Sequence, residues 1–159
     1  MNIVYCHHAQ RAHTGRQDDD ITDLGRRDAE LVGELMAQSP NVKSIYTSPF
    51  YRCTETARII NKHLNVPIIE DNRFNEYCSW EKKETWVDLQ KRVIAAIEDI
   101  VEKYNNEDTI ICVTSGVNIA GFLDWNLGLK PNKNMAYIGV SSCSPIIFRY
   151  EKGKNKCYN

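Results

Sequence analysis

Residues 42–57 read VKSIYTSPFYRCTETA and change from a strand pattern to a helix pattern within a few residues. The segment Val42–Thr47 is typical of a buried strand, and Ser48-Pro49 has the form of a helix start, a capping residue followed by proline. The predicted helix continues to about His63 and places Arg52 about one turn beyond the end of the strand. A strand that runs directly into a helix is the unit from which α/β folds are built.

The same unit recurs along the chain. We expect helices over residues 22–36, 48–63, 86–104 and 118–127, and strands over residues 2–6, 42–47, 66–69, 109–114, 138–141 and 146–150, the last after a turn near Ser144-Pro145. In the first helix, Leu24, Leu31, Leu35 and Met36 recur at helical spacing behind a Thr22 cap. The alternation predicts one α/β domain over residues 1–159, a three-layer αβα sandwich around a mainly parallel sheet.

Composition narrows the class of protein. The chain has 159 residues, 42% hydrophobic and 26% charged, as in globular proteins. A net charge of −1 gives no nucleic-acid footprint. No stretch approaches the roughly 18 apolar residues of a membrane span, and the first residues do not resemble a signal peptide. The six cysteines form no C-x-x-C pair, so we expect reduced thiols, a cytoplasmic protein, and no nucleic-acid or membrane partner.

Chemically useful side chains follow three of the predicted strands. They are His7-His8, Arg52 after Ser48-Pro49, and Ser115-Gly116 after Thr114. In open parallel sheets, ligands bind at the carboxyl ends of the strands. The sequence therefore predicts a binding site at that edge of the sheet.

Three interpretations of Cys6-His7-His8 are open on the residues alone. With His13 they could form a metal site, although successive strand residues point to opposite faces, which makes His7 and His8 poor partners for one ion. Cys6 could be the nucleophile of a cysteine phosphatase, but the spacing from Cys6 to Arg11 is one residue short of C-x5-R and the chain has no Asp-Pro. The third interpretation is that the histidines only end a strand. We expect no metal and no cofactor.

A set of motifs spread over the chain resembles the histidine phosphatase superfamily, the phosphoglycerate mutase-like proteins. The first is CHHAQ at residues 6–10, similar to Arg-His-Gly or Arg-His-Ala at the end of the family's first strand; the others are ITDLG at 21–25 with Asp28-Ala29, IYTSPFYR at 45–52 with TETA at 54–57, RFNE at 73–76, and ICVTSGV at 111–117. The segment 45–57 is the most specific of these. The resemblance implies a phosphoglycerate mutase-like fold.

The resemblance also implies roles for individual residues. His8 takes the place of the nucleophile that becomes a phosphohistidine, and Glu76 that of the acid that protonates the leaving oxygen. The phosphate would be bound by Arg52, together with His7 and Ser115. Further substrate contacts are expected from the loop and helix start beside these residues, namely Gln10, Arg11 and Gly116.

The chain departs from the family pattern at two pocket positions, with His7 in place of an arginine and Ser115 in place of the second histidine. An arginine is always charged, whereas a histidine is charged only in part near neutrality, and serine brings no charge. We expect a weak or specialised phosphatase acting on a phosphorylated small molecule or a phosphoprotein, or alternatively a pseudo-phosphatase that binds a phosphorylated ligand. The short segment at about 76–86 leaves little room for a lid, which favours hydrolysis over a mutase reaction.

Overall fold

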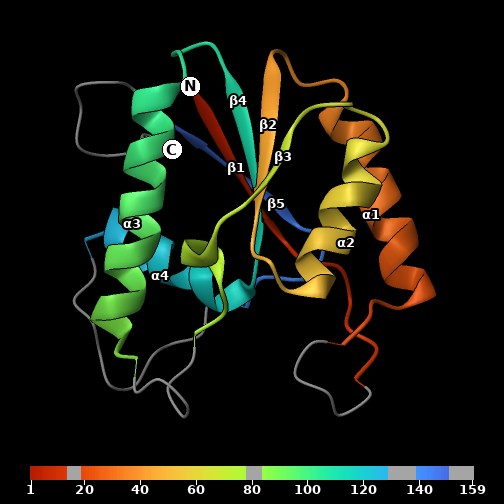
Figure 1. Ribbon diagram of the computed structural model, residues 1–159, viewed down its shortest axis with the longest axis horizontal. Helices are drawn as coiled ribbons and strands as arrows, with labels where there is room; N and C mark the ends of the chain where they lie inside the picture. The colour runs from red at the N-terminus through yellow and green to blue at the C-terminus, as the bar shows by residue number, and fades with distance from the viewer. Residues whose placement is uncertain (14–18, 78–83, 129–138, 151–159) are drawn as a thin grey trace.

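The structure, a computed structural model, describes residues 1–13, 19–77, 84–128 and 139–150. Within these ranges five strands form one sheet in the order β3-β2-β4-β1-β5 (Figure 1). The strands are β1 (Asn2–His7), β2 (Val42–Thr47), β3 (Ile68–Glu70), β4 (Thr109–Thr114) and β5 (Pro145–Arg149). Strands β1 to β4 run parallel to one another, and β5 runs antiparallel to β1. The predicted α/β fold with a mainly parallel sheet is therefore confirmed.

Helices cover both faces of the sheet. Helices α1 (Asp23–Met36) and α2 (Tyr51–Asn61) lie on one face, and α3 (Trp86–Lys103) and α4 (Gly116–Asn126) on the other (Figure 1). Because successive strand residues point to opposite faces, neighbours on β4 join different cores. Ile110 packs with Tyr5 and Phe122 beneath α3 and α4, whereas Ile111 packs with Val4 beneath α1 and α2. All six residues of β4 are buried, as the centre of the sheet requires.

Some element boundaries differ from the sequence-based expectations. Helix α2 begins at Tyr51 rather than at Ser48, whose hydroxyl instead donates to the side-chain oxygen of Asn75 at 2.9 Å. The short strand expected at 66–69 is β3, and the 3₁₀ helix η1 (Asn72–Phe74) follows it. Of the strand expected at 138–141, residue 138 lies outside the described residues, and 139–141 are not in a strand.

Helix α1 packs through small residues and not through the leucines that predicted it. Leu24, Leu31 and Leu35 are exposed; the core face is Gly25, Ala29, Val32, Gly33 and Met36. A side chain on Gly33 would meet the ring of His63 at the end of α2, with the added Cβ only 2.5 Å from Cδ2. The close approach of α1 to α2 thus depends on the absence of a side chain at Gly33, and the three leucines lie on the outer side of the helix.

The carboxyl ends of β1, β2 and β4 meet at the lower edge of the sheet in Figure 1. Backbone pairing continues just past the strand ends, since His8 donates to the carbonyl of Thr114 at 2.9 Å and Ser48 to that of Val113 at 3.1 Å. The residues that leave this edge are therefore fixed relative to one another. No helix in the described part of the chain is long and apolar enough to cross a membrane.

Candidate active site

His8 directly follows β1 and is buried with one ring nitrogen already engaged. Its Nδ1 lies 2.8 Å from the carbonyl oxygen of Ala9. Because a carbonyl can only accept, Nδ1 carries the hydrogen and Nε2 keeps its lone pair. Burial above all lowers the pKa of His8 to about 3, with smaller contributions from the neighbouring His7, Arg52 and Arg11. The imidazole is therefore neutral at ordinary pH, which is the form that a nucleophile requires.

His7 is the last residue of β1, and two contacts with the segment before β5 hold it. Its Nδ1 donates to the carbonyl of Val140 at 2.8 Å, and its own carbonyl accepts from the backbone nitrogen of Cys143 at 3.0 Å. The His7 and His8 rings stand edge to face with centroids 4.4 Å apart. Burial lowers the pKa of His7, so the neutral ring presents an acceptor and not a cation. His7 therefore lies beside His8 but differs in charge from the family's arginine.

Arg52 and Glu76 meet from different elements. Arg52 lies in the first turn of α2 with 1% of its side chain exposed, and its Nη2 donates to Oε2 of Glu76 at 2.5 Å. Glu76 follows η1, and its carboxylate is the more exposed of the two groups. The guanidinium also stacks over the ring of Phe50, 4.7 Å from its centroid. The predicted phosphate-binding cation and the predicted proton donor thus form an ion pair.

The start of α4 completes this edge of the sheet. Ser115 is the N-cap residue of α4, but its hydroxyl makes no capping bond and is buried without a hydrogen-bond partner among the described residues. A Cβ on Gly116 would lie 3.2 Å from Cε1 of His7, so the missing side chain leaves the helix start close to the histidine. A helix N-terminus favours an anion, and a buried hydroxyl without a partner costs about 1–3 kcal/mol that a bound anion could recover.

The two predicted substrate contacts in the loop after His8 make contacts within the protein. The Gln10 side-chain oxygen accepts from the hydroxyl of Thr22 at 2.8 Å, at the start of α1. The guanidinium of Arg11 pairs with the buried carboxylate of Asp19 at 2.8 Å. Arg11 is still close enough for its charge to contribute to the lowered pKa of His8. Of the two side chains, Arg11 is the one whose charge acts on His8.

The structure also bears on the other interpretations of Cys6-His7-His8. Within residues 1–13, 19–77, 84–128 and 139–150, no group of three or more His, Cys, Asp and Glu side chains could hold a metal ion. The Cys6 thiol is fully buried, and burial raises its pKa well above the usual range. A buried, protonated thiol is a poor nucleophile. Of Cys6 and His8, only the His8 ring is therefore in the form that a nucleophile needs.

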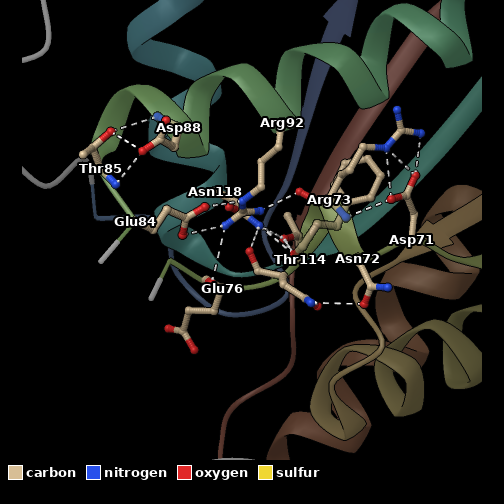
Figure 2. A network of polar contacts seen from close by, with 12 residues as sticks. Asp71, Asn72, Arg73, Glu76, Glu84, Thr85, Asp88, Arg92, Thr114 and Asn118 are labelled. Atoms are coloured by element: carbon tan, nitrogen blue, oxygen red, sulfur yellow. Dashed lines mark hydrogen bonds and ion pairs between the residues drawn. The ribbon is translucent and has the colours of Figure 1, made fainter. Parts of the chain in front are cut away.

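Residues that the sequence did not single out hold Glu76 in place. Asn118, in the first turn of α4, donates to the carbonyls of Phe74 and Asn75 at 2.6 and 2.8 Å. Arg92 of α3 donates to the carbonyl of Arg73 at 2.6 Å, and Figure 2 shows it reaching down from the helix to this segment. One signal was visible in the sequence, because Asn118 is a polar residue inside the apolar run VNIAGFL at 117–123.

Comparison with known proteins gives one family. The family model described as "Histidine phosphatase superfamily (branch 1)" matches residues 6–85 and 77–159. The "Uncharacterized phosphatase PhoE" of Bacillus subtilis (strain 168) is 28% identical over 94% of this chain and 86% of its own. Among solved structures, "Bacillus stearothermophilus YhfR" superposes with a TM-score of 0.85 at 21% identity, covering 99% of this chain and 94% of that one. A mycobacterial glucosyl-3-phosphoglycerate phosphatase complexed with VO3 superposes with a TM-score of 0.79 at 18% identity, covering 92% and 90%.

Proposed function

Since the chain belongs to the histidine phosphatase superfamily (branch 1), we propose that it is a phosphomonoesterase that works through a phosphohistidine on His8. The observation that carries the proposal is the state of His8, a buried imidazole whose Nδ1 is fixed by the Ala9 carbonyl while Nε2 keeps its lone pair. A neutral imidazole with a free lone pair on Nε2 is the form that attack on phosphorus requires. The relative named a phosphatase supports the same class of reaction.

The reaction would proceed in two displacements. In the first, the Nε2 lone pair of His8 attacks phosphorus, the bond from phosphorus to the ester oxygen breaks, and Glu76 gives its proton to that oxygen. In the second, a water oxygen attacks the phosphohistidine, Glu76 takes a proton from the water, and the P–N bond breaks to release phosphate and restore the lone pair. Because phosphoryl transfer depends mainly on positioning and charge stabilisation, one neutral nucleophile and one carboxyl group suffice for the proton transfers.

The phosphate would be bound with less positive charge than in the family pattern. Arg52 supplies the planar fork of donors, the start of α4 supplies backbone N–H groups near Gly116, and the buried Ser115 hydroxyl supplies one more donor. His7 contributes a donor at Nε2 only when it is protonated. Each missing donor in such a site costs about 10²–10³ in rate, so we infer a slow enzyme.

Several finer points belong to the same proposal. The substrate would be a phosphomonoester on a small molecule or on a protein, because the short segment at about 76–86 favours an open pocket. We take residues 1–159 as a single domain, and the buried thiols of the described chain, Cys6, Cys53, Cys112 and Cys143, suit the reducing cytoplasm.

One observation favours a second function, a pseudo-phosphatase that binds a phosphorylated ligand without turning it over. Glu76 already pairs with Arg52, and neither the neutral His7 nor Ser115 replaces that positive charge. Such a protein would still bind phosphate in the pocket but would not catalyse its hydrolysis at a useful rate. The two functions differ in one measurable property, which is turnover that depends on His8.

The test is hydrolysis of p-nitrophenyl phosphate between about pH 5 and pH 8 by the unaltered chain, by His8→Ala and by His7→Arg/Ser115→His. The proposed enzyme loses its turnover in His8→Ala and gains turnover in the double variant, which restores two cationic positions. His63→Ala, which alters an exposed histidine paired with Glu30, is the matched control and should keep full activity. Tighter phosphate binding by the double variant, with no turnover by any of the proteins, would support the pseudo-phosphatase instead.

A further inference from the structure

The side-chain amide of Asn118 holds the segment that carries Glu76. The Asn118 side chain is fully buried, and its Nδ2 lies 2.6 Å from the carbonyl oxygen of Phe74 and 2.8 Å from that of Asn75. These are the two residues immediately before Glu76. An amide nitrogen has two hydrogens, and the opposite orientation would set the amide oxygen against two carbonyl oxygens, so only one orientation fits. Asn118 therefore fixes the two peptide units before Glu76.

The hydroxyl of Thr114 also binds this segment. The Thr114 hydroxyl at the end of β4 donates to the Phe74 carbonyl at 2.7 Å, and its oxygen lies 2.7 Å from Nδ2 of Asn118, whose two hydrogens are shared among three acceptors. Thr114 and Asn118 flank Ser115 and Gly116, which line the proposed phosphate site. The same short stretch of chain thus supplies both the phosphate contacts and the support for the acid.

The segment is also held from the other side. The hydroxyl of Ser48, between β2 and α2, donates to the side chain of Asn75 at 2.9 Å, and α2 carries Arg52. Asn75 therefore connects the turn before Arg52 to the chain before Glu76. A general acid must lie within hydrogen-bond distance of the leaving oxygen, and an error of about 1 Å can cost about a hundredfold in rate.

We propose that Asn118, assisted by Thr114, is the positioning residue for the proton donor Glu76, and that it sets which leaving groups the enzyme can expel. This inference rests on the proposed phosphatase function. An alkoxide leaves only if it is protonated, whereas p-nitrophenoxide leaves readily without an acid. An acid displaced by loss of the amide would therefore slow hydrolysis of alkyl phosphates and leave aryl phosphates nearly unaffected.

The test compares kcat/KM for β-glycerophosphate, an alkyl phosphate, with kcat/KM for p-nitrophenyl phosphate. For each substrate, kcat/KM reports the steps up to loss of the leaving group and so does not include the later attack of water. For Asn118→Leu we expect a loss of about 10- to 100-fold on β-glycerophosphate, part of the roughly 10²–10⁴-fold that a general acid contributes, and less than threefold on p-nitrophenyl phosphate. Glu76→Gln should show the same selectivity to a larger extent. Glu76→Gln/Asn118→Leu should be no slower than Glu76→Gln, since the two residues act as one unit.

Two further variants keep the test sharp. Thr114→Val removes one hydroxyl from a strand that valine suits, and it should give a smaller loss with the same selectivity even if Asn118→Leu does not fold. Gln90→Leu is the matched control, because Gln90 is a buried amide that also donates to a backbone carbonyl, that of Gly121 at 3.3 Å, away from Glu76. Any loss in that variant should be equal for the two substrates.

The outcomes separate the two claims. If turnover depends on His8 but Asn118→Leu and Thr114→Val slow both substrates equally, or slow neither, the positioning role is wrong and the phosphatase remains. If the unaltered chain shows no turnover that depends on His8, the proposed function is wrong and the positioning role falls with it. A selective loss on β-glycerophosphate that disappears in the Glu76→Gln background supports both.

Discussion

Nη2 of Arg52 donates to Oε2 of Glu76 at 2.5 Å, so the cation that would clamp the phosphate is paired with the carboxylate that would protonate the leaving group. The guanidinium is almost fully buried, and a buried charge needs a partner. A phosphate that binds Arg52 meets the Glu76 carboxylate there, and the two anions repel each other. Entry of substrate therefore requires Glu76 to move away from Arg52 or to take up a proton.

This relationship predicts that Glu76→Gln binds inorganic phosphate more tightly than the unaltered chain. The glutamine brings no negative charge, which removes both the competition for Arg52 and the repulsion of the anion. We expect an affinity gain of about three- to tenfold, or roughly 1 kcal/mol, by isothermal titration calorimetry. Glu55→Gln is the control, because Glu55 pairs with Arg26 and Arg58, and it should leave the affinity unchanged. Equal or weaker binding by Glu76→Gln would mean that Glu76 does not oppose the phosphate.

The lowered pKa of His8 predicts that this residue destabilises the fold in acid. Unfolding returns the imidazole to its ordinary pKa near 6.5, whereas in the folded chain the pKa is about 3. Between these values the unfolded chain binds the extra proton, so stability falls as the pH drops below about 6.5. From pH 7 to pH 5 the contribution of His8 amounts to about 2 kcal/mol.

The measurement is urea unfolding at pH 7 and pH 5 for the unaltered chain and for His8→Gln. The variant should lose about 2 kcal/mol less than the unaltered chain over this range, whatever its stability at pH 7. His13→Gln, which removes an exposed histidine, should behave like the unaltered chain. The same acid dependence in His8→Gln as in the unaltered chain would show that His8 is not held in the neutral form.

The buried hydroxyl of Ser115 predicts opposite effects on stability and on binding. This hydroxyl has no partner among the described residues, so Ser115→Ala should raise the free energy of unfolding by about 1 kcal/mol. It should also weaken phosphate binding about three- to tenfold, because the anion loses a donor. Ser44→Ala is the matched control: Ser44 is equally buried, but its hydroxyl donates to Tyr104 at 2.9 Å, so its loss should destabilise the fold. If Ser115→Ala is also destabilised, the Ser115 hydroxyl has a structural partner and is not kept for a ligand.

Sequence patterns predicted the elements whose residues all share one environment. The run TIICVT at 109–114 is apolar throughout, which is typical of the central strand of a parallel sheet, and β4 has those bounds. The residues after β1, β2 and β4 could be placed at one edge because parallel strands bring their carboxyl ends together. The roles that the family resemblance gives to His8 and Arg52 remain predictions.

The features of the site that the sequence did not indicate are contacts between segments far apart in the chain. The amide of Asn118 bonds to carbonyls more than 40 residues earlier, and backbone acceptors leave no trace in a sequence. The pairing of Arg52 with Glu76 was hidden for the same reason, since each residue had its own role toward the substrate. The apolar spacing predicted helix α1 but not its inner face, because three of the four spaced residues are exposed leucines and the close approach to α2 depends on Gly33.

The exposure of the leucines of α1 gives a last prediction, which needs no ligand. Leu31 is 62% exposed, so Leu31→Ser removes apolar surface that is already in water and should change the free energy of unfolding by less than about 0.5 kcal/mol. Its neighbour Val32 is 6% exposed, and Val32→Ala should cost about 1–2 kcal/mol through lost burial and the cavity that is left. If the leucines formed the buried face of α1, Leu31→Ser would cost more stability than Val32→Ala. Urea unfolding of the two variants decides between them, because a Leu31→Ser loss larger than that of Val32→Ala would require the leucine stripe to be covered in the native protein.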